Sequence, residues 1–252
     1  MKDFIKMIAA VAGGISIALT SCSNPSEKTE SDFKYTIDSF ADLKVMRYRI
    51  PGWENLTLQQ KEYAYHLAEA AKYGRDILWD QNCKDNLRVR HALEAILETD
   101  VKDSEDWQNF LVYAKRVFFS NGIHHHYAED KIFPACPREY FASLLAKAGI
   151  DDPELLDIIY DPAIYPQRRS TETSGDIVKL SAVNFYDNVT CAEVEKYYAG
   201  IVDPKDPHPI SYGLNTKVVK GNDGIIRELR WKVGGIYSPA IEKICEELSK
   251  ER

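Results

Sequence analysis

The spacing of apolar residues constrains the fold of this chain most strongly, and it changes character after residue 162. Before that point, apolar side chains recur every three or four residues in segments bounded by helix-capping residues, which is typical of amphipathic helices. Beyond it, β-branched residues, turn residues and shorter helical segments are mixed. The pattern therefore predicts an α+β chain that is mostly helical, with a smaller β-structured core.

Capping signals place the helices of the first part. Thr57 with Gln60 three residues later is a capping-box pattern, and Gly122 is expected to end the helix before it. Pro137 occupies a first helical position, and Gly149 occupies a C-terminal cap position. In chain order, we expect helices over 57–79, 86–98, 104–119, 137–149 and 153–160.

The second part is expected to be mixed. Asn222, Asp223 and Gly224 tolerate positive φ, which favours a β-hairpin near 211–233. Thr190 with Glu193 is a second capping-box pattern. In chain order, we expect a loop with short irregular strands over 168–185, a helix over 190–199, hairpin strands over 211–219 and 225–233, and a helix over 238–248.

The N-terminal segment resembles a bacterial lipoprotein signal. Lys2 and Lys6 precede an apolar run that is too short to span a bilayer and ends in Leu-Thr-Ser-Cys, like a lipobox. The resemblance implies lipidation of Cys22; the alternative is an ordinary soluble secretory signal. We therefore expect 1–21 to be a lipoprotein signal peptide and the polar segment 22–35 to be a flexible, lipid-anchored tether. The expected location is the cell envelope, at the outer membrane of a Gram-negative bacterium, facing the periplasm or the exterior.

Charge limits the partners. The chain has 32 Lys and Arg against 39 Asp and Glu, a formal net charge of −7. Nucleic-acid binding depends on a basic face that neutralises phosphates, so we expect no nucleic-acid partner. The expected membrane partner is reached through the lipid on Cys22.

Three consecutive histidines form the densest polar cluster. In an extended chain, His124 and His126 would point the same way and could ligate a metal together, with Glu129 or Asp130 adding an oxygen. A third, distant ligand cannot be identified, and adjacent histidines more often bond carbonyls and carboxylates. The sequence also lacks H-E-x-x-H, G-x-S-x-G and P-loop patterns. We therefore predict no metal ligand and no catalytic residue in this chain.

Five stretches together resemble one enzyme family. They are VMRYRIPGW (45–53), GRDILWDQN (74–82), NGIHHHY (121–127), SYGLN (211–215) and WKVGGIY (231–237). In sequence, order and separation, they resemble the zinc-dependent dipeptidyl peptidase III family, in particular its bacterial lipoprotein-type members. Members of that family are two-lobed exopeptidases that remove dipeptides from the N-termini of short peptides across a wide cleft.

The resemblance implies a position for this chain within such an enzyme. Residues 36–252 would be its N-terminal lobe region, mainly helical over 36–162 and mixed over 163–252. The full-length family uses zinc, held by His-Glu and a second His after three intervening residues, and this sequence has no counterpart of that motif. We therefore expect no cofactor in this chain and no activity of the chain alone.

The same resemblance suggests substrate-binding residues. The 121–127 stretch would shape the lobe beside the peptide cleft; the alternative is buried polar scaffolding. The 211–215 stretch would be an edge of the β core that offers backbone groups to a peptide; the alternative is plain sheet structure. The candidate residues are Asn121, Gly122, His124, His126, Tyr127, Tyr212, Gly213 and Asn215.

Two functions fit these observations. In the first, the chain is the N-terminal fragment of a zinc-dependent dipeptidyl peptidase III-like exopeptidase, and its final helix continues into more of the same lobe. In the second, the chain is a non-catalytic peptide-binding or interaction lipoprotein. Both make short peptides the expected partner.

Overall fold

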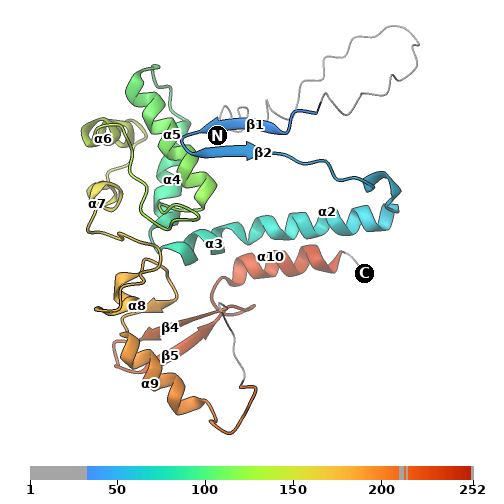
Figure 1. Cartoon of the computed structure of the whole chain (residues 1–252), viewed down its shortest axis with the longest axis vertical. Helices are drawn as coiled ribbons and strands as arrows, with labels where there is room; N and C mark the ends of the chain where they lie inside the picture. Colours follow the sequence, from blue (N-terminus) through green and yellow to red (C-terminus); the bar gives the residue numbers. More distant parts are fainter. Residues whose placement is uncertain (1–32, 210–212, 214, 251–252) are drawn as a thin grey trace.

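A computed structural model of the chain describes residues 33–209, 213 and 215–250, and it confirms the predicted α+β fold, mostly helical with small sheets (Figure 1). The predicted signal peptide 1–21 and Cys22 lie outside the described residues. None of the described helices is long and apolar enough to cross a membrane. In chain order, the elements are β1 (Thr36–Phe40), β2 (Leu43–Met46), the 3₁₀ turn η2 (Trp53–Asn55), α2 (Leu58–Tyr73), α3 (Arg75–Asn82), α4 (Asn86–Leu97), α5 (Glu105–Ser120), α6 (Arg138–Lys147), α7 (Pro153–Tyr160), α8 (Ile177–Leu180), β3 (Tyr186–Asp187), α9 (Cys191–Ile201), β4 (Thr216–Lys220), β5 (Ile226–Arg230) and α10 (Ser238–Ser249).

The main hydrophobic core lies among α3 to α7. Its centre is aromatic: Phe110 on α5 meets Phe141 on α6 edge-on, with ring centroids 5.3 Å apart, and Tyr113 contacts the same ring. Leu93 of α4 and Leu155 of α7 are fully buried in this cluster. The apolar spacing that predicts these helices therefore also identifies the faces that they bury.

One predicted helix is two. The sequence predicts a single helix over 57–79, but α2 ends at Tyr73 and α3 begins at Arg75. Gly74 between them donates its N–H to the carbonyls of Ala71 and Lys72 instead of continuing the regular helical bonding. Glycine has low helix propensity, and α3 buries Trp79 in the core whereas α2 runs outward beside α10 (Figure 1). The break therefore separates an inward segment from an outward one.

The larger sheet has the strand order β3–β4–β5. The predicted hairpin is confirmed: β4 and β5 are antiparallel, with Val218 opposite Glu228. The predicted loop over 168–185 is confirmed for most of the segment, but the short strands expected within it are wrong, because the segment contains α8 instead. The carboxylate of Asp176 accepts hydrogen bonds from the N–H groups of Val178 and Lys179, which caps this short helix.

A hairpin of β1 and β2 lies within the part expected to be mainly helical. It packs against α5: Lys115 binds the carboxylate of Asp38 at 2.9 Å, and the rings of Phe40 and Phe119 are 6.4 Å apart. The N–H of Arg47 donates to the carbonyl of Tyr35 at 2.9 Å. The pairing thus extends into residues 33–35, the end of the predicted tether.

The side chain of Asn86 joins two parts of the core. It is fully buried, its amide nitrogen donates to the carbonyl of Trp79 at 3.0 Å, and its amide oxygen accepts from the N–H of Ile123 at 3.1 Å. Gly122 leaves room for this side chain: a Cβ there would lie 2.2 Å from the Asn86 amide nitrogen, and its φ is +148°. The Asn86 amide therefore joins the end of α3 to the turn after α5.

We expect Asn86→Ala to lower the free energy of unfolding by about 1–3 kcal/mol, because it leaves the buried N–H of Ile123 without a partner and removes one of the two donors to the carbonyl of Trp79, which also accepts from the N–H of Cys83. The measurement is urea unfolding followed by far-UV circular dichroism. The matched control is Asn222→Ala at an exposed position, which should change stability by less than about 0.5 kcal/mol. Equal effects of the two substitutions would contradict the role assigned to Asn86.

Candidate functional site

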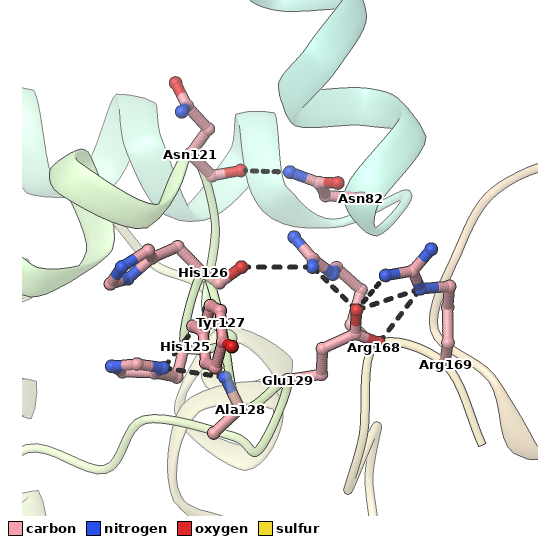
Figure 2. A network of polar contacts seen from close by, with 9 residues as sticks. All are labelled: Asn82, Asn121, His125, His126, Tyr127, Ala128, Glu129, Arg168 and Arg169. Atoms are coloured by element: carbon pink, nitrogen blue, oxygen red, sulfur yellow. Dashed lines mark hydrogen bonds and ion pairs between the residues drawn. The ribbon is translucent and has the colours of Figure 1, made fainter. Parts of the chain in front are cut away.

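The 121–130 turn follows α5 directly. Asn121 has φ 53° and ends the helix, and its carbonyl accepts a hydrogen bond from the side-chain amide of Asn82 at 3.0 Å (Figure 2). The N–H of His125 donates to the carbonyl of Asp130 at 2.8 Å, which closes the turn. Asn121 and Gly122 thus form the bend after α5, as their sequence predicts.

His124 is buried. Its Nε2 lies 2.8 Å from the carbonyl of Tyr165, and because a carbonyl only accepts, Nε2 carries the proton. Nδ1 is buried and has no hydrogen-bond partner among the described residues. Burial lowers the pKa of His124 to about 4, so the ring is neutral at pH 7. The geometry favours the scaffolding alternative for this residue.

His125 and His126 occupy different environments from His124. His125 Nδ1 accepts hydrogen bonds from the N–H groups of Tyr127 (3.2 Å) and Ala128 (2.9 Å), and its Nε2 lies 3.2 Å from a carboxylate oxygen of Asp42 (Figure 2). The His126 ring is exposed and meets Phe119 edge-on, with centroids 5.0 Å apart. His124 and His126 therefore do not share a face, because the chain turns here instead of running extended.

Two arginines lock the turn. Arg169 binds both carboxylate oxygens of Glu129 at 2.9 Å, and Arg168 binds one at 2.9 Å while it also donates to the carbonyl of His126 at 3.3 Å (Figure 2). Hydrogen bonds from Arg169, and then from Arg168, lower the pKa of Glu129 to about 2. This ion-pair cluster was missed at the sequence level, because its members lie about forty residues apart.

Tyr127 is the most exposed candidate of the turn. Its side chain is 87% exposed, so it and His126 are the side chains of the 121–127 stretch that are open to a ligand. The locked backbone holds both at fixed positions on the surface.

The second candidate stretch lies at the start of the larger sheet. The carbonyl of Asn215 accepts from the N–H of Trp231 at 2.9 Å, which extends the ladder of β4 and β5. Gly213 has φ 58° and lines a hollow of about 600 Å³. Tyr212 lies outside the described residues. The two candidate stretches are not brought together: α5 and β4 lie on different sides of α3 (Figure 1).

At Ile226 and Glu228, the outer edge of β5 pairs with no other strand of the described part of the chain. Two backbone hydrogen bonds flank the β4–β5 ladder. The N–H of Gly221 donates to the carbonyl of Ile225 at 3.1 Å, and the N–H of Trp231 donates to the carbonyl of Asn215 at 2.9 Å. Because bonded and non-bonded pairs alternate in an antiparallel ladder, the N–H and C=O groups of Ile226 and Glu228 point away from β4. Sequence alone indicated the hairpin but not which strand lies at the edge.

Hollows flank this edge. The larger, of about 600 Å³, lies between the end of α9 and β5, and it is lined by two tyrosines, carboxylates and aliphatic side chains. The smaller, of about 510 Å³, lies beside Lys232, Gly235 and Ile236. The hydroxyl of Tyr198 donates to the carboxylate of Glu228 at 2.8 Å in the larger hollow. Two hollows beside β5 thus have room for side chains of a bound partner.

Within residues 33–209, 213 and 215–250, no group of three or more His, Cys, Asp or Glu side chains is placed to hold a metal ion. No family model and no curated protein matches the sequence.

The buried His124 predicts a pH dependence of stability. Its folded pKa is about 4 and its ordinary value is 6.5, so the unfolded chain binds the extra proton as the pH falls below 6.5. Stability from neutral His124 is therefore complete above pH 6.5 and declines toward pH 4, by roughly 3 kcal/mol in all. We expect His124→Gln, which keeps a donor for Tyr165, to flatten this decline.

The measurement is urea unfolding between pH 7 and about 5.5, above the ordinary pKa of 4.5 at which Glu129 begins to titrate in the unfolded chain. The control is His208→Gln at an exposed histidine, which should retain the decline of the parent chain. A parent chain whose stability is constant over this range would contradict the assignment.

Proposed function

We propose that this chain is the N-terminal, peptide-holding part of a lipid-anchored, zinc-dependent dipeptidyl peptidase III-like exopeptidase. The observation that carries the proposal is the open edge of β5 at Ile226 and Glu228, with two hollows beside it. A peptide in strand conformation binds such an edge through main-chain hydrogen bonds, and pockets for alternate side chains add selectivity. This mode of binding suits a peptidase that holds short peptides extended.

The backbone of β5 sets the register of the peptide. Ile226 and Glu228 each present one N–H and one C=O outward, so an added strand makes up to four hydrogen bonds there. Beyond them, the carbonyl of Arg230 already accepts from the N–H of Ile236, at 3.3 Å. The open stretch is therefore short, and it fits a peptide of a few residues.

Side chains of the bound peptide alternate between the two faces of the sheet. On one face, residues 226 and 228 lie over Val218 and Tyr198, toward α9 and the larger hollow. A peptide side chain on that face enters the hollow between Tyr197, Tyr198 and the end of α9. The residues of this chain thus bind and orient the peptide.

Peptide-bond cleavage needs groups beyond these. In the family that the chain resembles, zinc activates the attacking water, and no counterpart of the zinc motif occurs in this sequence. The proposed role of the described residues is accordingly limited to peptide binding and positioning.

The alternative, a non-catalytic peptide-binding lipoprotein, uses the same strand edge. The core among α3 to α7 supports it, because these helices bury a continuous cluster of apolar side chains of this chain. The two functions differ in whether this chain acts as part of a longer peptidase.

We expect Glu228→Pro to weaken peptide binding about tenfold relative to Glu228→Ala. Both variants lose the carboxylate, but proline also removes the outward N–H, which the β4–β5 ladder does not use. The measurement is fluorescence anisotropy with a labelled hexapeptide of alternating threonine and valine. The same peptide N-methylated at alternate positions should bind weakly to both variants. Equal affinities of the proline and alanine variants would contradict binding at the β5 edge.

The peptidase assignment predicts the size of the product in cells. An immunoblot of source cells with an antibody against residues 36–252 should show a band much larger than 28.7 kDa, because the zinc motif has to reside on the same polypeptide. A single band at the mass of this chain would contradict the peptidase assignment and support the binding lipoprotein.

A further inference from the structure

The first described residues and the segment after β2 form a basic, aromatic surface, here called the basic-aromatic tip and comprising 33–35 and 47–53. The guanidinium groups of Arg47 and Arg49 lie over the ring of Phe33, at 4.6 and 4.7 Å from its centroid. Arg47 Nε also donates to the carbonyl of Lys34 at 2.8 Å. These contacts join the two segments into one surface.

Large apolar side chains project from this tip. Tyr48 is 73% exposed and Ile50 is 68% exposed, and Trp53 is also exposed. A shallow hollow of about 600 Å³ opens between Arg49, Ile50 and Trp53. Exposed aromatic residues beside basic ones are the side chains found where proteins meet the headgroup region of a membrane.

The charge of the tip is opposite to that of the whole chain. Lys34, Arg47 and Arg49 give it three positive charges in a chain of net charge −7. The acidic residues of the neighbouring hairpin are engaged elsewhere: Asp38 binds Lys115, and Asp42 lies beside Arg116 and His125. Among the described residues that line the hollow of the tip, Glu54 carries the one negative charge beside the basic groups. The tip therefore attracts anionic surfaces that the rest of the molecule repels.

The short segment between Cys22 and the tip indicates that the tip meets the membrane that holds the lipid anchor. Ten residues lie between Cys22, the predicted site of lipidation, and Phe33. Even fully extended, a chain of that length reaches at most about 40 Å. Whenever Cys22 is anchored, the tip is the described part of the molecule nearest to the lipid along the chain.

We propose that the basic-aromatic tip docks on an anionic phospholipid surface and orients the folded chain on the membrane that holds the Cys22 anchor. The arginines face the lipid phosphates, and Tyr48, Ile50 and Trp53 enter the headgroup region. This contact goes beyond the proposed peptide binding, and it does not use the β5 edge.

The test uses the chain from residue 22 onward with Cys22→Ser, which keeps every described residue and removes the acyl chains. The measurement is co-sedimentation with phosphatidylcholine vesicles containing about 30 mol% phosphatidylglycerol, and with pure phosphatidylcholine vesicles. Each basic residue near an anionic surface contributes about fivefold to partitioning. We therefore expect Arg47→Glu with Arg49→Glu to reduce binding to the anionic vesicles at least about 25-fold.

The matched control is Lys102→Glu with Lys179→Glu, which changes the net charge equally at exposed positions outside the tip. It should retain most of the binding. A second variant, Tyr48→Ser with Ile50→Ser, removes exposed side chains and should also weaken binding. Equal losses in the control and the arginine variant, or no binding of the parent chain to anionic vesicles, would overturn the proposal. Fluorescence anisotropy with the labelled hexapeptide, measured on the same samples, reports peptide binding by itself. Loss of membrane docking can therefore be distinguished from loss of the proposed peptide binding.

Discussion

The buried side chain of Asn86 is the interaction on which the rest of the structure depends. It satisfies a carbonyl at the end of α3 and an N–H in the turn after α5, and it is fully buried in doing so. Because a buried polar group without a partner is costly, both segments are held to one geometry. Gly122 is required beside it, since any Cβ there would overlap the amide. The Asn86 amide thus fixes where the 121–127 stretch leaves the core, together with the hydrogen bond from Asn82 to the carbonyl of Asn121.

Local signals made most of the helices predictable. The capping boxes at Thr57 and Thr190 are present as expected, because they involve residues three positions apart. The β4–β5 hairpin was predictable for the same reason. The β1–β2 hairpin was not, because its position depends on contacts with α5 such as that of Lys115 with Asp38. The helix break at Gly74 likewise reflects the different partners of α2 and α3.

The candidate site was predictable only as a stretch of sequence. The turn conformation buries His124 and exposes His126, whereas an extended chain would place them on one face. Arg168 and Arg169, which lock the turn through Glu129, come from a segment with no signal for this role. The open edge of β5 depends on strand order, which periodicity does not reveal. What the sequence lacked in each case was information on distant partners.

The two surfaces proposed for binding lie apart in the molecule, and their separation is informative. In Figure 1, the β1–β2 hairpin and the β4–β5 hairpin lie on opposite sides of α2 and α3. A chain resting on its basic-aromatic tip therefore holds β5 away from the lipid. In the proposed function, the strand edge would then stay open to soluble peptides. The net charge of −7, repelled by anionic lipid, favours the same orientation, because Lys34, Arg47 and Arg49 give the tip the opposite charge.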